Sequence, residues 1–181
     1  MLVPYAGWVA FATALNASIA RRNPPQPAGT VDCHEERNAV RLQRTVIVEK
    51  PLDKVFAYLS DFTTTTEWDP GTVKTVRASG DGGFGTEYLN TSTFAGRETQ
   101  LTYVVEDLVP NRHISLRGEN KTVIAHDTMT FRETGGQTEV TYTADFTFKG
   151  ITKFIAPLMK PAFVRLGNQA ESGMAAALAR L

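Results

Sequence analysis

The chain has 181 residues, of which 42% are hydrophobic and 21% are charged, a composition typical of a globular domain with a short extension. Its 19 Lys and Arg residues are balanced by 19 Asp and Glu residues, so the charge predicts no surface for phosphate backbones, and we expect no nucleic-acid partner. The single cysteine, Cys33, excludes an internal disulfide, a Cys-rich zinc site and a Cys-x-x-Cys redox pair. This usage fits a reducing compartment, and we expect a cytoplasmic protein.

The N-terminal part, residues 1–38, differs in composition from the rest of the chain. Residues 1–20 carry no charged side chain, and a proline-rich run at residues 23–27 follows soon after, which predicts a helix and then a linker. Several interpretations of residues 1–20 stay open: a membrane anchor diluted by polar residues, a signal peptide without a basic start, a packed helix, or an extension with no folded role. We therefore divide the chain into residues 1–38 and residues 39–181, with membrane association through residues 1–20 as the alternative localisation.

A regular pattern of secondary structure begins near Val40. A period-two run of apolar residues up to Val48 predicts the first strand, and Asp53 is suited to N-cap a short helix whose apolar face includes Val55 and Leu59. A second short helix is expected at residues 63–68. Turns rich in Gly, Asn, Asp and Pro then separate six strands of an antiparallel meander. These strands are expected at Thr72 to Ser79, Gly85 to Ala95, Thr99 to Val109, Arg112 to Gly118, Thr122 to Glu133 and Thr138 to Lys149.

The C-terminal segment changes to a helical period. From Ile151 to Leu181 apolar residues recur at intervals of three or four, which predicts a helix with one apolar stripe. Pro157 and Pro161 should kink or break its beginning, so we expect the regular helix to start near Ala162. The sheet with its apolar face is the natural surface for that stripe to cover.

Two strings of residues carry a family resemblance. The string Val55 to Phe62 (VFAYLSDF), followed by Trp68 to Gly71 (WDPG), resembles the opening of the polyketide cyclase and dehydrase type proteins of the START and birch-pollen-allergen superfamily. The resemblance extends from about Leu42 to Leu181. It implies an α+β helix-grip fold, in which a curved antiparallel sheet wraps a long C-terminal helix, with two short helices after the first strand and a ligand cavity between sheet and helix. It is less specific for function, because this fold hosts lipid carriers, hormone receptors and ring cyclases alike.

Strand parity within the implied fold predicts which side chains line that cavity. Alternate residues of a strand face the same side, so the inward positions of each strand follow from its pattern. The lining is mostly apolar with a few polar groups, as a small-molecule pocket requires. The expected ligand-binding residues are Trp68, Tyr88, Asn90, Ser92, Leu101, Tyr103, Asp127, Met129, Tyr142, Phe146, Phe163 and Leu166. We further predict an actual void between Tyr142 and Phe146 of the last strand and Phe163 and Leu166 of the helix.

Asp127 is the most informative of these residues. A carboxylate on an apolar strand face must be hydrogen-bonded, paired or protonated. Tyr103 and Tyr142 have the parity to be its partners, and these three residues are the catalytic candidates. In the functional interpretation Asp127 anchors a ligand or transfers a proton with a raised pKa. In the structural interpretation, which we favour, it accepts a hydrogen bond from a neighbouring hydroxyl or arginine, or lies at an edge that solvent reaches.

Motifs for other chemistry are missing from the sequence. No Gly-x-Ser-x-Gly, His-Glu-x-x-His, phosphate loop or dinucleotide fingerprint occurs, so we expect no cofactor and no metal. His113 and His126 fall on the polar parity of their strands, which predicts surface positions. Arg97, in a hairpin, is interpreted as a solvated turn residue rather than a guard of the cavity mouth.

Two hypotheses of function remain. The favoured hypothesis is a non-enzymatic protein that binds or carries a lipid or polyketide-like metabolite in an internal cavity. The alternative is a polyketide aromatase or cyclase, in which pocket Tyr and Asp side chains act as acid and base groups. The cyclase needs polar groups that converge on one point of the cavity, whereas the binder needs only apolar volume. The sequence leaves the oligomeric state open.

Overall fold

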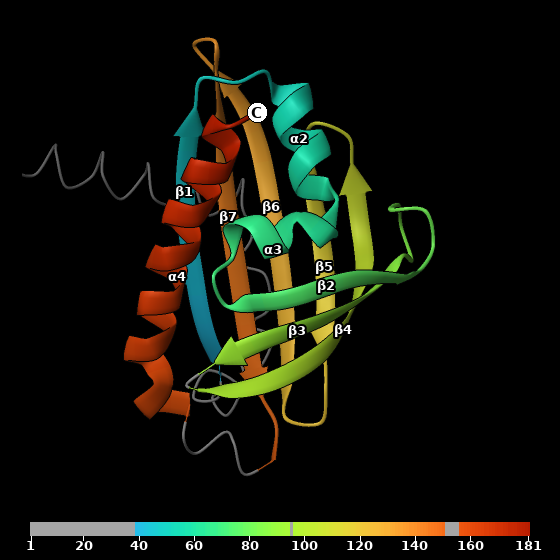
Figure 1. Cartoon of the computed structure of the whole chain (residues 1–181), viewed down its shortest axis with the longest axis vertical. Helices are drawn as coiled ribbons and strands as arrows, with labels where there is room; N and C mark the ends of the chain where they lie inside the picture. The colour runs from blue at the N-terminus through green and yellow to red at the C-terminus, as the bar shows by residue number, and fades with distance from the viewer. Residues whose placement is uncertain (1–38, 95, 151–155) are drawn as a thin grey trace, which may run out of the picture. The chain divides into compact units, whose positions relative to one another are not determined.

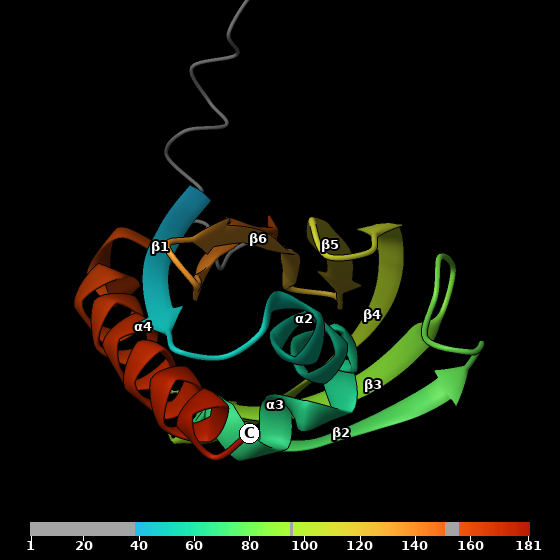
Figure 2. The ribbon, with the colours of Figure 1, turned by 90° about the horizontal axis from the view of Figure 1, so that it is seen from above.

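The structure is a computed structural model that describes residues 39–94, 96–150 and 156–181. A curved antiparallel sheet surrounds two short helices, and a long helix lies across its open side (Figure 1, Figure 2). The interpretations of residues 1–38, including the membrane anchor and the signal peptide, lie outside the described residues. The elements are β1 (Ala39–Val48), α2 (Leu52–Ser60), η2 (Phe62–Thr64), α3 (Thr65–Trp68), β2 (Thr72–Ser79), β3 (Glu87–Phe94), β4 (Arg97–Val109), β5 (His113–Glu119), β6 (Val123–Thr134), β7 (Gln137–Phe148) and α4 (Ala156–Ala179).

The sheet has seven strands in the order β1-β7-β6-β5-β4-β3-β2. Strands β2 to β7 form the predicted meander, and the last strand, β7, also pairs with the first strand, β1. Register shifts interrupt β2 between Arg77 and Ser79 and β4 between Val105 and Asp107. Irregularities of this kind bend a strand and increase its twist. The resulting curvature gives the sheet a concave face, visible in Figure 2, and this arrangement confirms the helix-grip fold.

The short helices follow β1, as expected from the sequence, and they lie on the concave face of the sheet, but the start of α2 differs in detail. Helix α2 begins at Leu52 after Pro51, and no side chain caps it. Asp53 is therefore not the N-cap; it lies in the first turn, where a negative charge favours the helix dipole. Val55 and Leu59 are buried, which fixes the face of α2 that meets the sheet.

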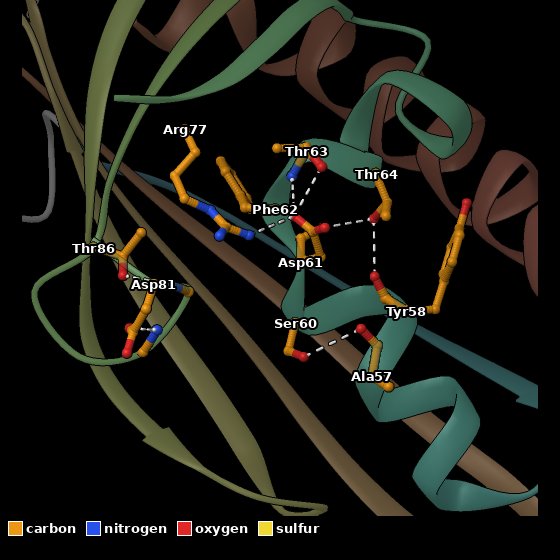
Figure 3. Close-up of polar contacts among 12 residues, drawn as sticks. Ala57, Tyr58, Ser60, Asp61, Phe62, Thr63, Thr64, Arg77, Asp81 and Thr86 are labelled. Carbon is orange, nitrogen blue, oxygen red and sulfur yellow. Dashed lines mark hydrogen bonds and ion pairs between the residues drawn. The ribbon is translucent and has the colours of Figure 1, made fainter. Parts of the chain in front are cut away.

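The chain changes direction at a corner between the end of α2 and the start of η2. The Asp61 carboxylate accepts hydrogen bonds from the backbone N–H of Thr63 at 3.1 Å and from its hydroxyl at 2.8 Å. The same carboxylate lies 3.7 Å from the Arg77 guanidinium of β2. A dashed line in Figure 3 marks this ion pair. The Thr64 hydroxyl donates to the carbonyl groups of Tyr58 and Asp61 across the corner. These contacts attach the short helices to one edge of the sheet.

Helix α4 begins earlier than the prolines predict. It runs without a break from Ala156 to Ala179 and includes Pro161, so the expected start near Ala162 is wrong. Pro157 lies in the first turn, where backbone N–H groups have no partner inside the helix, and Pro161 removes only one hydrogen bond of the next turn. No helix of the described residues is long and apolar enough to cross a membrane.

In the described part of the chain, the core consists of two separate clusters of buried side chains. The larger one joins the sheet and the short helices to the C-terminal half of α4 through Ala170, Met174 and Leu178. The smaller one joins Val40 and Leu42 of β1 to Phe163 near the start of α4. Helix α4 therefore packs against the rest of the domain at two places along its length, and a space lies between these two contacts.

Candidate functional site

A cavity of about 530 Å³ lies between the two core clusters, beneath α4. This volume is within the range of small-molecule pockets. Phe163, Leu166, Gly167 and Ala170 form its helical wall, and their spacing places them on one face of α4. The predicted void between β7 and this helix is therefore present. Phe146 and Phe163 touch, with ring centroids 4.9 Å apart, but they border the space rather than fill it.

Most of the predicted ligand-binding residues line this cavity. Lining residues of the predicted set are Trp68, Asn90, Ser92, Leu101, Tyr103, Asp127, Tyr142, Phe146, Phe163 and Leu166. Trp68, on α3, is almost fully buried, and its ring packs edge-on against Tyr142 with centroids 5.7 Å apart. The two side chains thus belong to the same wall.

Tyr88 and Met129 lie on the concave face as parity predicts, but the structure places both in the packed core and not on the cavity wall. Tyr88 is fully buried against Phe62 of η2, with ring centroids 5.6 Å apart, and the Arg77 guanidinium lies over its ring. Met129 is fully buried in the larger cluster. The short helices cover this end of the concave face, so inward residues there meet protein and not the cavity.

The three catalytic candidates converge on one wall of the cavity. Asp127 of β6 is 3% exposed, and its carboxylate accepts a hydrogen bond from the Tyr142 hydroxyl at 3.1 Å. The Tyr103 hydroxyl is its second hydrogen-bonding partner. The Tyr103 ring reaches this position across β5 because residue 118 is glycine; a Cβ atom there would lie 2.5 Å from the ring. Convergence of these polar groups is the feature that the cyclase hypothesis requires.

Burial controls the protonation of this cluster. Desolvation raises the pKa of Asp127 to about 7, although hydrogen bonds from Tyr103 and Tyr142 act in the opposite direction. Burial raises the pKa of Tyr103 and of Tyr142 well above the usual value for tyrosine, and the nearby Asp127 carboxylate adds to both shifts. Near neutral pH the two tyrosines are hydrogen-bond donors, and Asp127 is divided between its charged and neutral forms.

A second carboxyl group, Asp69, also lines the cavity, and the sequence pattern did not predict it. It follows α3, accepts from the backbone N–H of Gly71 at 3.0 Å and from the Thr72 hydroxyl at 2.7 Å, and its pKa is raised by burial. The run Asp69-Pro70-Gly71 is typical of a helix end, so the pattern indicated a turn and not that Asp69 lines a cavity. Its signals in the sequence were its proximity to Trp68 and its place in the WDPG string that carries the family resemblance.

The polar wall at β2 and β3 is internally hydrogen-bonded. Asn90 donates to the Thr75 hydroxyl at 2.8 Å and accepts from the Ser92 hydroxyl at 2.5 Å. Thr75 also bonds to Thr65 of α3 at 2.7 Å. These groups form a chain that links α3 to the sheet, so they support the wall and also present hydroxyl and amide groups to the cavity.

Charged residues at the other end of the cavity are exposed. Arg97 and Glu98, at the start of β4, line the cavity and are open to solvent, so Arg97 is both a solvated hairpin residue and part of the rim. His113 and His126 lie outside the cavity lining and contact Asp107 and Glu106 respectively. Among the described residues no group of three or more His, Cys, Asp and Glu side chains is placed to hold a metal ion.

Comparison with known proteins agrees with this architecture. The family described as polyketide cyclase / dehydrase and lipid transport matches residues 39–181. The fold and its cavity are those of a helix-grip protein, as the sequence resemblance implied. The chain belongs to the polyketide cyclase / dehydrase and lipid transport family. No curated protein matches it.

Solved structures share the fold at low identity. The Zhui aromatase/cyclase from Streptomyces sp. R1128 is 18% identical, with a TM-score of 0.64 over 78% of this chain and 92% of that one. A START superfamily protein from Mycobacterium smegmatis is 12% identical, with a TM-score of 0.64 over 76% of this chain and 95% of that one. Ara h 8.0201 is 13% identical, with a TM-score of 0.52 over 75% and 97%. At these identities the likeness concerns the fold.

Proposed function

We propose that residues 39–181 bind a small, mostly apolar molecule in the cavity beneath α4, with a polar group of that molecule directed to Asp127 and its two tyrosines. One observation carries this proposal: an apolar cavity of about 530 Å³ has a hydrogen-bonded carboxyl group on its inner wall. Apolar area supplies affinity in such pockets, and a few polar groups fix orientation. The family, whose description includes lipid transport, supports a binding role.

A polyketide cyclase or aromatase activity is the second candidate, and the convergence of Asp127, Tyr103 and Tyr142 favours it. A carboxyl group with a pKa of about 7 takes up and releases protons readily at neutral pH. Two tyrosine hydroxyls beside it could hold the oxygen of an enolate in an apolar surrounding. The aromatase/cyclase among the structural neighbours supports this candidate on the level of the fold.

The binding proposal is tested by filling the cavity. Ala144 of β7 is buried and lines the cavity beside Asp127, whereas Ala125 of β6 is buried in the packed core. With naphthylethanol as the probe, isothermal titration calorimetry should show binding that Ala144→Leu weakens by about tenfold or more. Ala144→Leu should unfold at nearly the wild-type denaturant concentration, while Ala125→Leu should cost about 1 to 3 kcal/mol of stability through overpacking. Unchanged probe affinity in folded Ala144→Leu would refute binding in this cavity.

Solvent deuterium exchange separates the two candidates. A tetralone is apolar, resembles the probe in size, and carries hydrogens next to its carbonyl group that exchange through an enolate. A cyclase-like site should accelerate this exchange, measured by NMR, and Asp127→Asn should abolish the acceleration. Binding of the ketone without accelerated exchange would support the binder alone.

A further inference from the structure

The charged groups that line the cavity are unevenly distributed. Asp127, which is 3% exposed, and the partly buried Asp69 lie on its inner walls. The one basic side chain that lines it among the described residues, Arg97, is exposed. Neither carboxyl group forms an ion pair with a Lys, Arg or His of the described residues. The interior thus offers two acids without a countercharge.

Such carboxyl groups are costly unless a positive partner is supplied. Removing a carboxylate from water costs several kcal/mol, which the tyrosine hydrogen bonds to Asp127 offset only in part. Asp69 and Asp127 also oppose each other's ionisation, since the Asp69 charge adds to the rise in the pKa of Asp127. A cation bound between the sheet and α4 would relieve both penalties.

Aromatic rings surround the same region. Phe62, Trp68, Tyr103 and Tyr142 all line the cavity, and Trp68 contacts Tyr142 directly. Aromatic faces attract cations, most strongly where water is excluded. A carboxylate ligand, in contrast, would meet two like charges at this end. Within the part of the chain that the structure describes, it would find one basic lining residue, Arg97, at the exposed rim.

We propose that the cavity selects a protonated amine attached to an apolar body, with the ammonium group at the end lined by Asp69 and Asp127 and the apolar body toward Phe146 and Phe163. This inference rests on the proposed binding function and names the chemical class of its ligand. An ammonium group has three N–H donors, and a carboxylate has about four acceptor positions, so the hydrogen bonds already made to Asp69 and Asp127 leave positions free.

Binding of an amine should depend on pH. The groups that act on Asp127 are Tyr103 of β4, Tyr142 and Asp145 of β7, and Asp69 after α3. The tyrosines stay neutral in the physiological range because burial raises the pKa of each. An alkyl amine, with a pKa near that of lysine at about 10, stays charged there. As the pH rises from about 6 to about 8, Asp127 becomes ionised, and affinity for an amine should therefore increase.

A matched set of probes tests the inference by isothermal titration calorimetry. Naphthylethylamine, naphthylethanol and naphthylacetic acid share one ring system and differ in a terminal group that is positive, neutral or negative. At a pH of about 8 the full-length protein should bind the amine about tenfold more tightly than the alcohol, and the acid most weakly. Asp127→Asn and Asp69→Asn should each reduce the preference for the amine. The control Glu133→Gln, an exposed carboxyl group of β6 outside the cavity lining, should retain it.

The outcomes separate this inference from the binding proposal. If the alcohol binds as tightly as the amine, or the acid binds best, the selection for an amine is refuted while binding in the cavity stands. If no probe binds, the proposed function itself fails. Should an Asp variant not fold, the order of the three probes and its pH dependence in the wild-type protein still decide the question.

Discussion

At the scale of single residues, Asp127 contributes to stability and to the site in opposite directions. A carboxyl group on the buried face of β6 opposes folding whenever it is ionised, because burial removes the water that stabilises its charge. The same burial gives it a pKa of about 7 and makes it responsive to a ligand's charge or proton. If residue 127 only supported the fold, a neutral hydrogen-bonding side chain would serve equally well at this position.

The pKa of Asp127 predicts how stability varies with pH. Folding raises this pKa from an ordinary value of 3.8 to about 7, so between these pH values the folded protein holds more protons than the unfolded chain. The free energy of unfolding that Asp127 contributes is therefore fully present below about pH 4 and is lost as the pH rises to about 7. Asp127→Asn lacks this dependence, and its stability relative to the wild type should rise by on the order of 4 kcal/mol across the range. Urea unfolding of both proteins measures the difference; parallel pH profiles would contradict the assignment.

Gly118 determines where the Tyr103 ring lies. These residues are paired across β4 and β5, and a Cβ atom at residue 118 would lie 2.5 Å from the ring. Gly118→Ala should displace the ring from Asp127 and cost about 1 to 3 kcal/mol of stability. In a Tyr103→Ala background the same change should cost much less, since the clashing ring is gone. Chemical denaturation of the four proteins measures the coupling between residues 103 and 118. If Gly118→Ala costs the same stability with and without the Tyr103 ring, the ring is not the source of that cost.

Sequence parity predicted the polar cluster but not the limits of the cavity. Asp127, Tyr103 and Tyr142 could be grouped because they occupy inward positions of strands with clear alternation. Parity fixes the face of a side chain but not what covers it, which is why Tyr88 and Met129 were assigned to a wall that the short helices occupy. Asp69 was missed because a helix end is read as a turn, and the pattern does not show which side of the turn meets a cavity.

At the scale of elements, the contact of α4 with α3 holds one side of the site. The backbone of the two helices is so close at Gly173 that a Cβ atom there would lie 2.1 Å from the Trp68 carbonyl oxygen. Trp68 and Asp69 both line the cavity, so this approach sets the position of α3 relative to the helical wall.

Gly173→Ala should separate α3 from α4. In an open helix this change would stabilise by up to about 1 kcal/mol, so a net loss of stability reports the clash with the Trp68 carbonyl. Gly167→Ala is a control in the same helix, because its nearest neighbour, the Arg44 guanidinium at 3.4 Å, ends a flexible side chain. Thermal unfolding should show a lower melting temperature for Gly173→Ala and little change for Gly167→Ala. Equal behaviour of the two variants would contradict the close packing.

At the scale of the whole molecule, the fold could be predicted because two independent patterns agreed. Turn residues divided the chain into the strands of a meander, and the change of period after Gly150 predicted one long helix to cover the sheet. The start of α4 could not be predicted, because proline tolerance depends on where the first turn lies. The cavity volume could not be predicted either, since it depends on the two clusters that hold α4.

The folded unit should not require the N-terminal residues. The family match starts at residue 39, where β1 begins, and the proline-rich linker precedes it. Deletion of residues 1–36 should therefore leave cooperative thermal unfolding at nearly the same temperature. Circular dichroism of the truncated and full-length proteins tests this. A loss of cooperativity would show that the segment belongs to the core.

We expect the space beneath α4, with its polar inner wall, to bind naphthylethanol. A crystal structure of the full-length protein with this probe would show where it lies. The naphthyl ring should lie between Phe146 and Leu166, with the hydroxyl within hydrogen-bonding distance of Asp127 or Tyr142. A cavity closed by its own side chains, or a probe bound only on the outer surface of the sheet, would contradict it.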